Sequence, residues 1–241
     1  MMRTSNPALS DNTFRGVSGV AGSEAMTIQG TANKALVLTL LLLATAAWAW
    51  NNPYAGMQLL LPALIAGFIV AMVTIFKKDW APVTAPLYAL IEGVILGGIS
   101  VMTEQQYPGI VGQAVGLTIG TLFALLLVYQ SGLIKVTDNF RLGIVAATGG
   151  IALFYFISFV LGFFHVRVPM INDSSPLGIG FSVFVVAIAA LNLVLDFDFI
   201  EKGADSGAPK YMEWYGAFGL IVTLIWLYLE ILRLLAKSRR R

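Results

Sequence analysis

Four carboxyl side chains stand inside long apolar stretches of this 241-residue sequence: Glu92, Asp196, Asp198 and Glu230. A charged side chain at the centre of a bilayer costs at least about 3 kcal/mol, so each of these acids calls for a reason. Burial away from water, or a second acid sharing the site, moves the titration of a carboxyl group towards neutral pH. Clustered carboxylates, once ionised, suit a hard cation such as calcium. These residue types therefore predict proton sensing and cation attraction.

Two of the acids also have a purely structural interpretation. Glu230 and Arg233 are three residues apart, and two residues at that spacing on a helix can neutralise each other. Arg233 is also the only base that we place within an apolar segment. Asp198 lies near the end of its segment and can extend to the membrane surface. The sequence leaves the pairing role and the functional role of both acids open.

The other two acids favour a functional role. Asp196 lies deeper than Asp198, and Asn192 is one helical turn earlier on the same face. Glu92 is at mid-depth in its segment, with no evident partner nearby in sequence. We predict that Glu92 and Asp198 are candidates for an ion pathway.

The composition predicts the scaffold that must position these groups. Hydrophobic residues make up 58% of the chain and charged residues 12%, and the mean hydropathy is +0.81. These values exclude a water-soluble domain, a disordered chain and a fibrous protein. A helix needs about 20 apolar residues to cross a bilayer. We predict an all-α, polytopic membrane protein, a bundle of seven transmembrane helices, over Ala35–Trp50, Met57–Phe76, Pro82–Met102, Ile110–Tyr129, Leu142–Phe164, Leu177–Ile200 and Trp214–Leu235.

Charge and composition also predict the organisation of the chain. Residues 1–33 are expected to form a flexible polar tail, residues 34–236 the transmembrane domain, and residues 237–241 a basic tail. Lysines and arginines concentrate in the loops that share a side with the amino terminus, which places that terminus in the cytoplasm. Seven full spans then put the basic carboxyl end outside, against the same rule. Either the last segment is only partly inserted, or the rule is broken there.

Small residues indicate where helices approach closely. Gly93 and Gly97 form a small-xxx-small pair in the third segment. Gly112, Gly116 and Gly120 form a longer ladder in the fourth. Such patterns favour close packing between helices in lipid.

The sequence resembles the Bax inhibitor (transmembrane Bax inhibitor motif) family, and its bacterial YccA-like branch in particular. Three features carry the resemblance: seven spans, the stretch LVLDFDFIEK over 193–202, and the stretch LYLEILR over 227–233. The resemblance implies a seven-helix bundle in a bacterial cytoplasmic (inner) membrane, which conducts a pH-sensitive calcium leak across that membrane. It also implies that an acid on the sixth helix and an acid on the seventh share a proton and gate the pore, and Asp196 and Glu230 match these positions.

Two departures from the family pattern bear on that gate. The second acid is Glu where the family has Asp, and Asp196 and Glu230 are 34 residues apart, farther than the family's pair. Straight, full-length helices would put these two acids near opposite faces of the membrane. Pairing would require the last segment to start later, or to break around Gly216 and Gly219.

The sequence also allows one alternative to a channel and excludes several classes of enzyme and metal site. A non-conducting regulator that binds another membrane protein, such as a membrane protease, is the alternative, with the two tails as contact surfaces. Cysteine is absent and histidine occurs once, at His165, so thiolate catalysis and Cys- or His-rich metal sites are excluded. The sequence also lacks the motifs of intramembrane proteases and the lysine that retinal binding requires in the last span. We expect no enzymatic activity, no cofactor and no nucleic-acid partner; the partners are the lipid bilayer and calcium or other cations.

Overall fold

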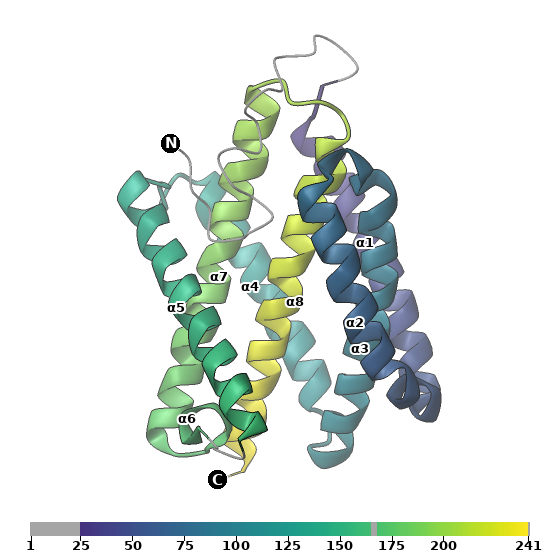
Figure 1. Cartoon of the computed structure of the whole chain (residues 1–241). Coiled ribbons are helices and arrows are strands. Elements are labelled where there is room, and N and C mark those ends of the chain that lie inside the picture. The colour runs from purple at the N-terminus through teal and green to yellow at the C-terminus, as the bar shows by residue number, and fades with distance from the viewer. Residues whose placement is uncertain (1–24, 165–167, 241) are drawn as a thin grey trace. The chain divides into compact units, whose positions relative to one another are not determined.

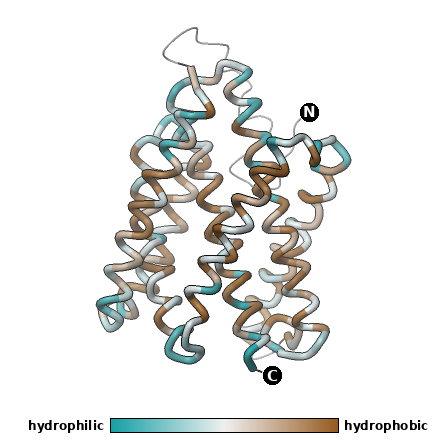
Figure 2. The backbone as a smooth tube through the Cα atoms, turned by 180° about the vertical axis from the view of Figure 1, so that it is seen from behind, coloured by the Kyte–Doolittle hydropathy of each residue, from teal (hydrophilic) through white to brown (hydrophobic). Residues whose placement is uncertain are grey.

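Seven long helices dominate the computed structural model, which describes residues 25–164 and 168–240 (Figure 1). All seven are long and apolar enough to cross a membrane, which confirms the predicted fold class. Figure 2 shows the hydrophobic colour along the helices and the hydrophilic colour at their connections. The long helices are α1 (Ile28–Asn51), α2 (Pro53–Phe76), α3 (Ala81–Gln106), α4 (Ile110–Gln130), α5 (Asp138–Phe163), α7 (Pro176–Asp205) and α8 (Met212–Arg239), with a 3-10 turn η2 (Lys78–Trp80) and a four-residue helix α6 (Pro169–Asn172).

The ends of the helices differ from the sequence prediction at both termini. The expected polar tail, 1–33, lies largely outside the described residues, but α1 already begins at Ile28. Thr27 caps this helix, because its hydroxyl accepts a hydrogen bond from the Gly30 amide. At the other end α8 continues to Arg239, so most of the expected basic tail, 237–241, is helical. Lys237, assigned to that tail, is buried.

The chain divides into two compact units, and the boundaries fall inside α7 and α8. The first, here called the Glu92 unit, comprises among the described residues 25–108 and Asp198–Val222. The second, the Glu230 unit, comprises Gly109–Phe197 and the chain from Thr223 onward.

Glycine contacts organise the Glu92 unit. A Cβ added at Gly93 would collide with Thr45 and with the Leu42 carbonyl, and one at Gly97 would meet the Ala46 carbonyl at 2.5 Å. The backbones of α1 and α3 therefore lie in direct contact, which confirms the close packing expected for this pair.

The glycine ladder of α4 behaves differently. No described atom outside the helix lies within 4 Å of a Cβ built at Gly112, Gly116 or Gly120. Within the Glu230 unit, the described residues therefore show no close packing at this ladder. The pattern fixes which residues share a helix face, whereas the rotation of the helix decides what that face meets.

The Glu230 unit is held by apolar packing between α5 and α7. Ile151 on α5 packs with Val185 and Ile188 on α7, and all three are buried. Tyr155 and Trp226 pack against this cluster and bring α8 to it.

Candidate functional site

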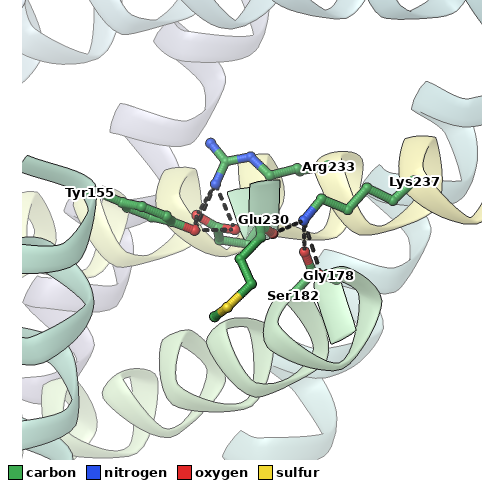
Figure 3. A network of polar contacts seen from close by, with 7 residues as sticks. Tyr155, Gly178, Ser182, Glu230, Arg233 and Lys237 are labelled. Atoms are coloured by element: carbon green, nitrogen blue, oxygen red, sulfur yellow. Dashed lines mark hydrogen bonds and ion pairs between the residues drawn. The ribbon is translucent and has the colours of Figure 1, made fainter. Parts of the chain in front are cut away.

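Glu230 is the centre of a polar network within the Glu230 unit (Figure 3). Its side chain is 2% exposed, and both carboxylate oxygens accept hydrogen bonds. The Tyr155 hydroxyl lies 3.1 and 3.2 Å from these oxygens, and Arg233 Nη1 lies 3.0 and 3.1 Å from them. The structure thus brings Glu230 and Arg233 together as an ion pair, one helical turn apart on α8.

Tyr155 completes this network from α5. Arg233 Nη1 donates to the Tyr155 hydroxyl at 2.7 Å, and the guanidinium carbon lies 5.1 Å from the centre of the tyrosine ring. A buried carboxylate is tolerated when its oxygens are hydrogen-bonded and its charge is paired, and here both conditions are met. The network couples the charge of Glu230 to the contact between α8 and α5.

Asp196 lies in the same unit on α7 and is fully buried. One turn earlier, the Asn192 side-chain amide donates to Thr148 Oγ1 at 2.9 Å. Asn192 thus lies level with Thr148, and Glu230 lies level with Tyr155, seven residues later on α5. Asp196 is four residues beyond Asn192 on α7, which runs opposite to α5, so Asp196 lies still farther from the level of Tyr155. At 1.5 Å per residue, Asp196 and Glu230 therefore differ in position along the helices by about 16 Å. α8 shows no break at Gly216 or Gly219 that would bring them closer.

The two remaining candidate acids belong to the Glu92 unit. Asp198 accepts a 2.7 Å hydrogen bond from Lys202, one turn later on α7, in an ion pair near the helix end. Glu92 is half-buried on α3. Its carboxylate lies against Gly67 of α2, because a Cβ built at Gly67 would be 3.2 Å from Glu92 Oε1. The Tyr88 hydroxyl is hydrogen-bonded to Glu92, so the carboxylate does have a partner one turn earlier. Tyr88 in turn packs edge-on against Phe218 of α8.

Within residues 25–164 and 168–240, no group of three or more His, Cys, Asp or Glu side chains is arranged to hold a metal ion. His165, the single histidine of the sequence, lies outside the described residues.

A model of the family described as Bax inhibitor 1 like matches residues 6–240, almost the whole chain. The chain belongs to this family. No curated protein and no solved structure matches it. The predicted Bax inhibitor resemblance is confirmed, and its assignment to the YccA-like branch stays a prediction.

Sequence reasoning missed three polar residues that matter in this Bax inhibitor family member. Tyr155 stands in the apolar run Leu153–Ile157, and nothing in sequence links it to an acid on α8. Tyr88 carried a usable signal, because it precedes Glu92 by four residues and therefore shares its helix face.

The third is Glu213, at the first turn of α8 in the Glu92 unit. Its side chain is 0% exposed, and its carboxylate is ion-paired with Lys34 at 2.6 Å and Lys210 at 3.0 Å. It also accepts hydrogen bonds from the backbone and hydroxyl of Thr27. The predicted last span begins at Trp214, so Glu213 stood just outside it and was not among the candidate acids.

Proposed function

We propose that this Bax inhibitor family member is a pH-sensitive calcium (cation) leak channel, gated by protonation of intramembrane carboxylates. The observation that carries the proposal is the Glu230 network, in which one buried carboxylate holds Tyr155 on α5 and Arg233 on α8. Hydrogen bonds to an ionised group are stronger than those between neutral groups. A change in the charge of Glu230 therefore changes what fastens α8 to α5.

Protonation supplies the switch. The ionised carboxylate accepts hydrogen bonds from both Tyr155 and Arg233, and it balances the arginine charge. A neutral carboxyl group no longer balances that charge, so Arg233 has reason to move towards water; its side chain is already 38% exposed. A local charge change acting on the contact between two helices is a common form of switch.

We propose further that Asp196 and Glu230 act as two separate gating sites, not as one pair that shares a proton. The level difference of about 16 Å along the helices supports this, because carboxylates must lie within about 6 Å to couple strongly. Asp196 is then a second sensing group, and Glu92 and Asp198 are acids that attract cations along the pathway.

The first test is calcium-dye flux into proteoliposomes at pH 6 and pH 8. Asp196→Asn and Glu230→Gln are compared with the unmodified protein, with Glu92→Gln as a pathway variant. Asp205→Asn, at an exposed position, is the matched control. We expect each gating variant to remove part of the pH dependence, and the control to leave the flux unchanged.

Different outcomes point to different conclusions. If Asp196→Asn alone and Glu230→Gln alone each remove all of the pH dependence, the two acids act as one pair and the separate-site proposal fails. If folded protein gives no flux above that of empty liposomes, the channel fails. The non-conducting regulator, which binds a membrane protein such as a protease, is then the better account.

We also propose that the amino terminus faces the cytoplasm of a bacterial inner membrane. Seven spans then bring the end of α8 to the outer side. Because the chain has no cysteine, single cysteines report the orientation without a background. Gln106→Cys, at the last residue of α3, is expected to react with an impermeant maleimide in intact cells, whereas Lys77→Cys, between α2 and α3, is not. The reverse labelling would refute this orientation.

A further inference from the structure

The ammonium group of Lys237 lies in a cradle of three oxygen atoms within the Glu230 unit (Figure 3). Lys237 Nζ donates to the Met170 carbonyl at 3.0 Å, the Gly178 carbonyl at 3.0 Å and the Ser182 hydroxyl at 2.8 Å. The residue is 3% exposed. An ammonium group has three N–H donors, and here each donor has its own acceptor.

The oxygens come from a turn that is built by its own contacts. Met170 lies in α6, and Gly178 and Ser182 lie in the first two turns of α7. The Gly178 amide donates to Ser175 Oγ at 3.2 Å. A Cβ at position 178 would collide with the Asp173 carbonyl, so the close approach of α7 to the preceding turn requires glycine there. The cradle is thus formed without any contribution from α8 to its walls.

The chemistry of the cradle suits a primary ammonium ion. Burying a charge is costly unless polar partners replace its water shell, and three neutral oxygens do so for Lys237. The charged groups that act on the ammonium at longer range are Arg233, Glu230 and Asp173. A guanidinium has a planar fork of five donors, which does not match three acceptors around one nitrogen.

We propose that the Met170, Gly178 and Ser182 oxygens form a binding site for primary ammonium groups, in which Lys237 is a tethered occupant. Small primary ammonium ions enter the site when the tether is removed. In the intact protein the occupied cradle fastens the last turn of α8 to the segment 170–182.

The cradle also fixes the position of Glu230. Lys237 follows Glu230 by seven residues, two turns along the same face of α8. While Lys237 is bound in the cradle, α8 can neither rotate nor slide without breaking these three hydrogen bonds. Glu230 and Arg233 are therefore held at the position on α8 where they contact Tyr155. This consequence for ion flow rests on the proposed channel function, whereas the cradle itself does not.

The decisive measurement is thermal unfolding of the purified full-length protein in detergent. We expect Lys237→Ala to lower Tm by several degrees. Added methylammonium is expected to restore Tm in a saturable way, and tetramethylammonium at the same ionic strength is expected not to, because it has no N–H donor. Ser182→Ala in the Lys237→Ala background removes one acceptor and is expected to weaken the methylammonium effect.

Two further variants keep the test decisive even if Lys237→Ala does not fold. Lys237→Met retains the length and apolar stem of the side chain, and Ser182→Ala alone removes one acceptor while leaving the lysine. We expect both to unfold at lower temperature than the unmodified protein. The proposal would be overturned if Lys237→Met were as stable as the unmodified protein. It would also be overturned if methylammonium and tetramethylammonium restored the Tm of Lys237→Ala equally.

Calcium flux separates the cradle from the channel. We expect Lys237→Ala to leak more at both pH values and methylammonium to reduce that leak. If methylammonium restores Tm but no variant conducts, the cradle stands and the channel function fails. If the unmodified protein conducts but methylammonium restores neither Tm nor the closed state, the cradle fails and the channel stands.

Discussion

The Tyr155 hydroxyl on α5 donates to the Glu230 carboxylate on α8 at 3.1 Å, across 75 residues of sequence. The same hydroxyl accepts from Arg233, so one phenol oxygen contacts both members of the ion pair. Tyr155 thereby makes the fit between two helices depend on the charge of a single buried acid.

Removing the phenol oxygen tests this dependence. Tyr155→Phe keeps the ring over Arg233 but leaves Glu230 with Arg233 as its remaining partner in the network. We expect a loss of about 1 kcal/mol in the free energy of unfolding, the usual size for one buried hydrogen bond. A double-mutant cycle with Glu230→Gln, read by denaturant unfolding in detergent, measures the coupling. A coupling energy of zero would show that Tyr155 and Glu230 contribute independently.

The α1–α3 contact is tested by two glycine variants that differ only in surroundings. Gly93→Ala forces a methyl group against Thr45 and the Leu42 carbonyl, and we expect it to cost about 1–3 kcal/mol by overpacking. Gly116→Ala on α4 meets no described atom within 4 Å, and alanine is the better helix former, so stability is expected to be unchanged or slightly higher. Thermal unfolding of both variants decides. Equal losses would contradict the packing difference between the two helices.

Glu213 is predicted to be essential for stability and not for ion selectivity. Glu213→Gln leaves Lys34 and Lys210 facing a neutral group, and we expect a loss of about 3 kcal/mol, typical of breaking a buried ion pair from one side. The matched control is Asp205→Asn at an exposed position of the same unit. Protease resistance of the 25–34 segment provides a second readout, because the backbone of Thr27 is bound to Glu213. Unchanged stability in Glu213→Gln would refute the prediction.

The turn before α7 holds an acid outside the spans, Asp173, whose charge is expected to affect stability. Hydrogen bonds from the Ser175 side chain, followed by those from the backbone of Ser175 and Ser174, hold the pKa of Asp173 below its ordinary value of 3.8. A carboxyl group with a lowered folded-state pKa contributes stability above its unfolded-state pKa and loses it as the pH falls through the folded-state value. We therefore expect Asp173→Asn to lower Tm at pH 7 and to have little effect once the pH is below the lowered folded-state pKa of Asp173, in a pH series of thermal unfolding. A Tm difference that persists at the lowest pH would mean that Asp173 acts through something other than its charge.

The seven helices could be predicted from sequence because each signal is local. About 20 consecutive apolar residues are enough to identify a span, wherever its neighbours lie. The same holds for the pairing of Glu230 with Arg233, since residues three apart on a helix are neighbours. Helix ends were less predictable: α8 runs on to Arg239 because Lys237 is satisfied by oxygens of residues that lie more than 50 positions away.

The separation of Asp196 and Glu230 along their helices could be predicted from residue numbers, but their partners could not. Counting residues along straight helices predicted that the two acids lie far apart, and the unbroken α8 agrees with that arithmetic. The arithmetic could not name Tyr155 as the partner that Glu230 meets on α5.

The sequence by itself therefore determined the membrane class, the number of spans, the family and three of the buried acids, Asp196, Asp198 and Glu230. The tertiary structure alone decided which glycines touch a neighbour, which acid meets which tyrosine, and that Lys237 enters an oxygen cradle. The physical reason is that hydropathy and residue spacing act within one helix. Partners on other helices depend on helix rotation and register, and these are set by side-chain packing between segments distant in the chain.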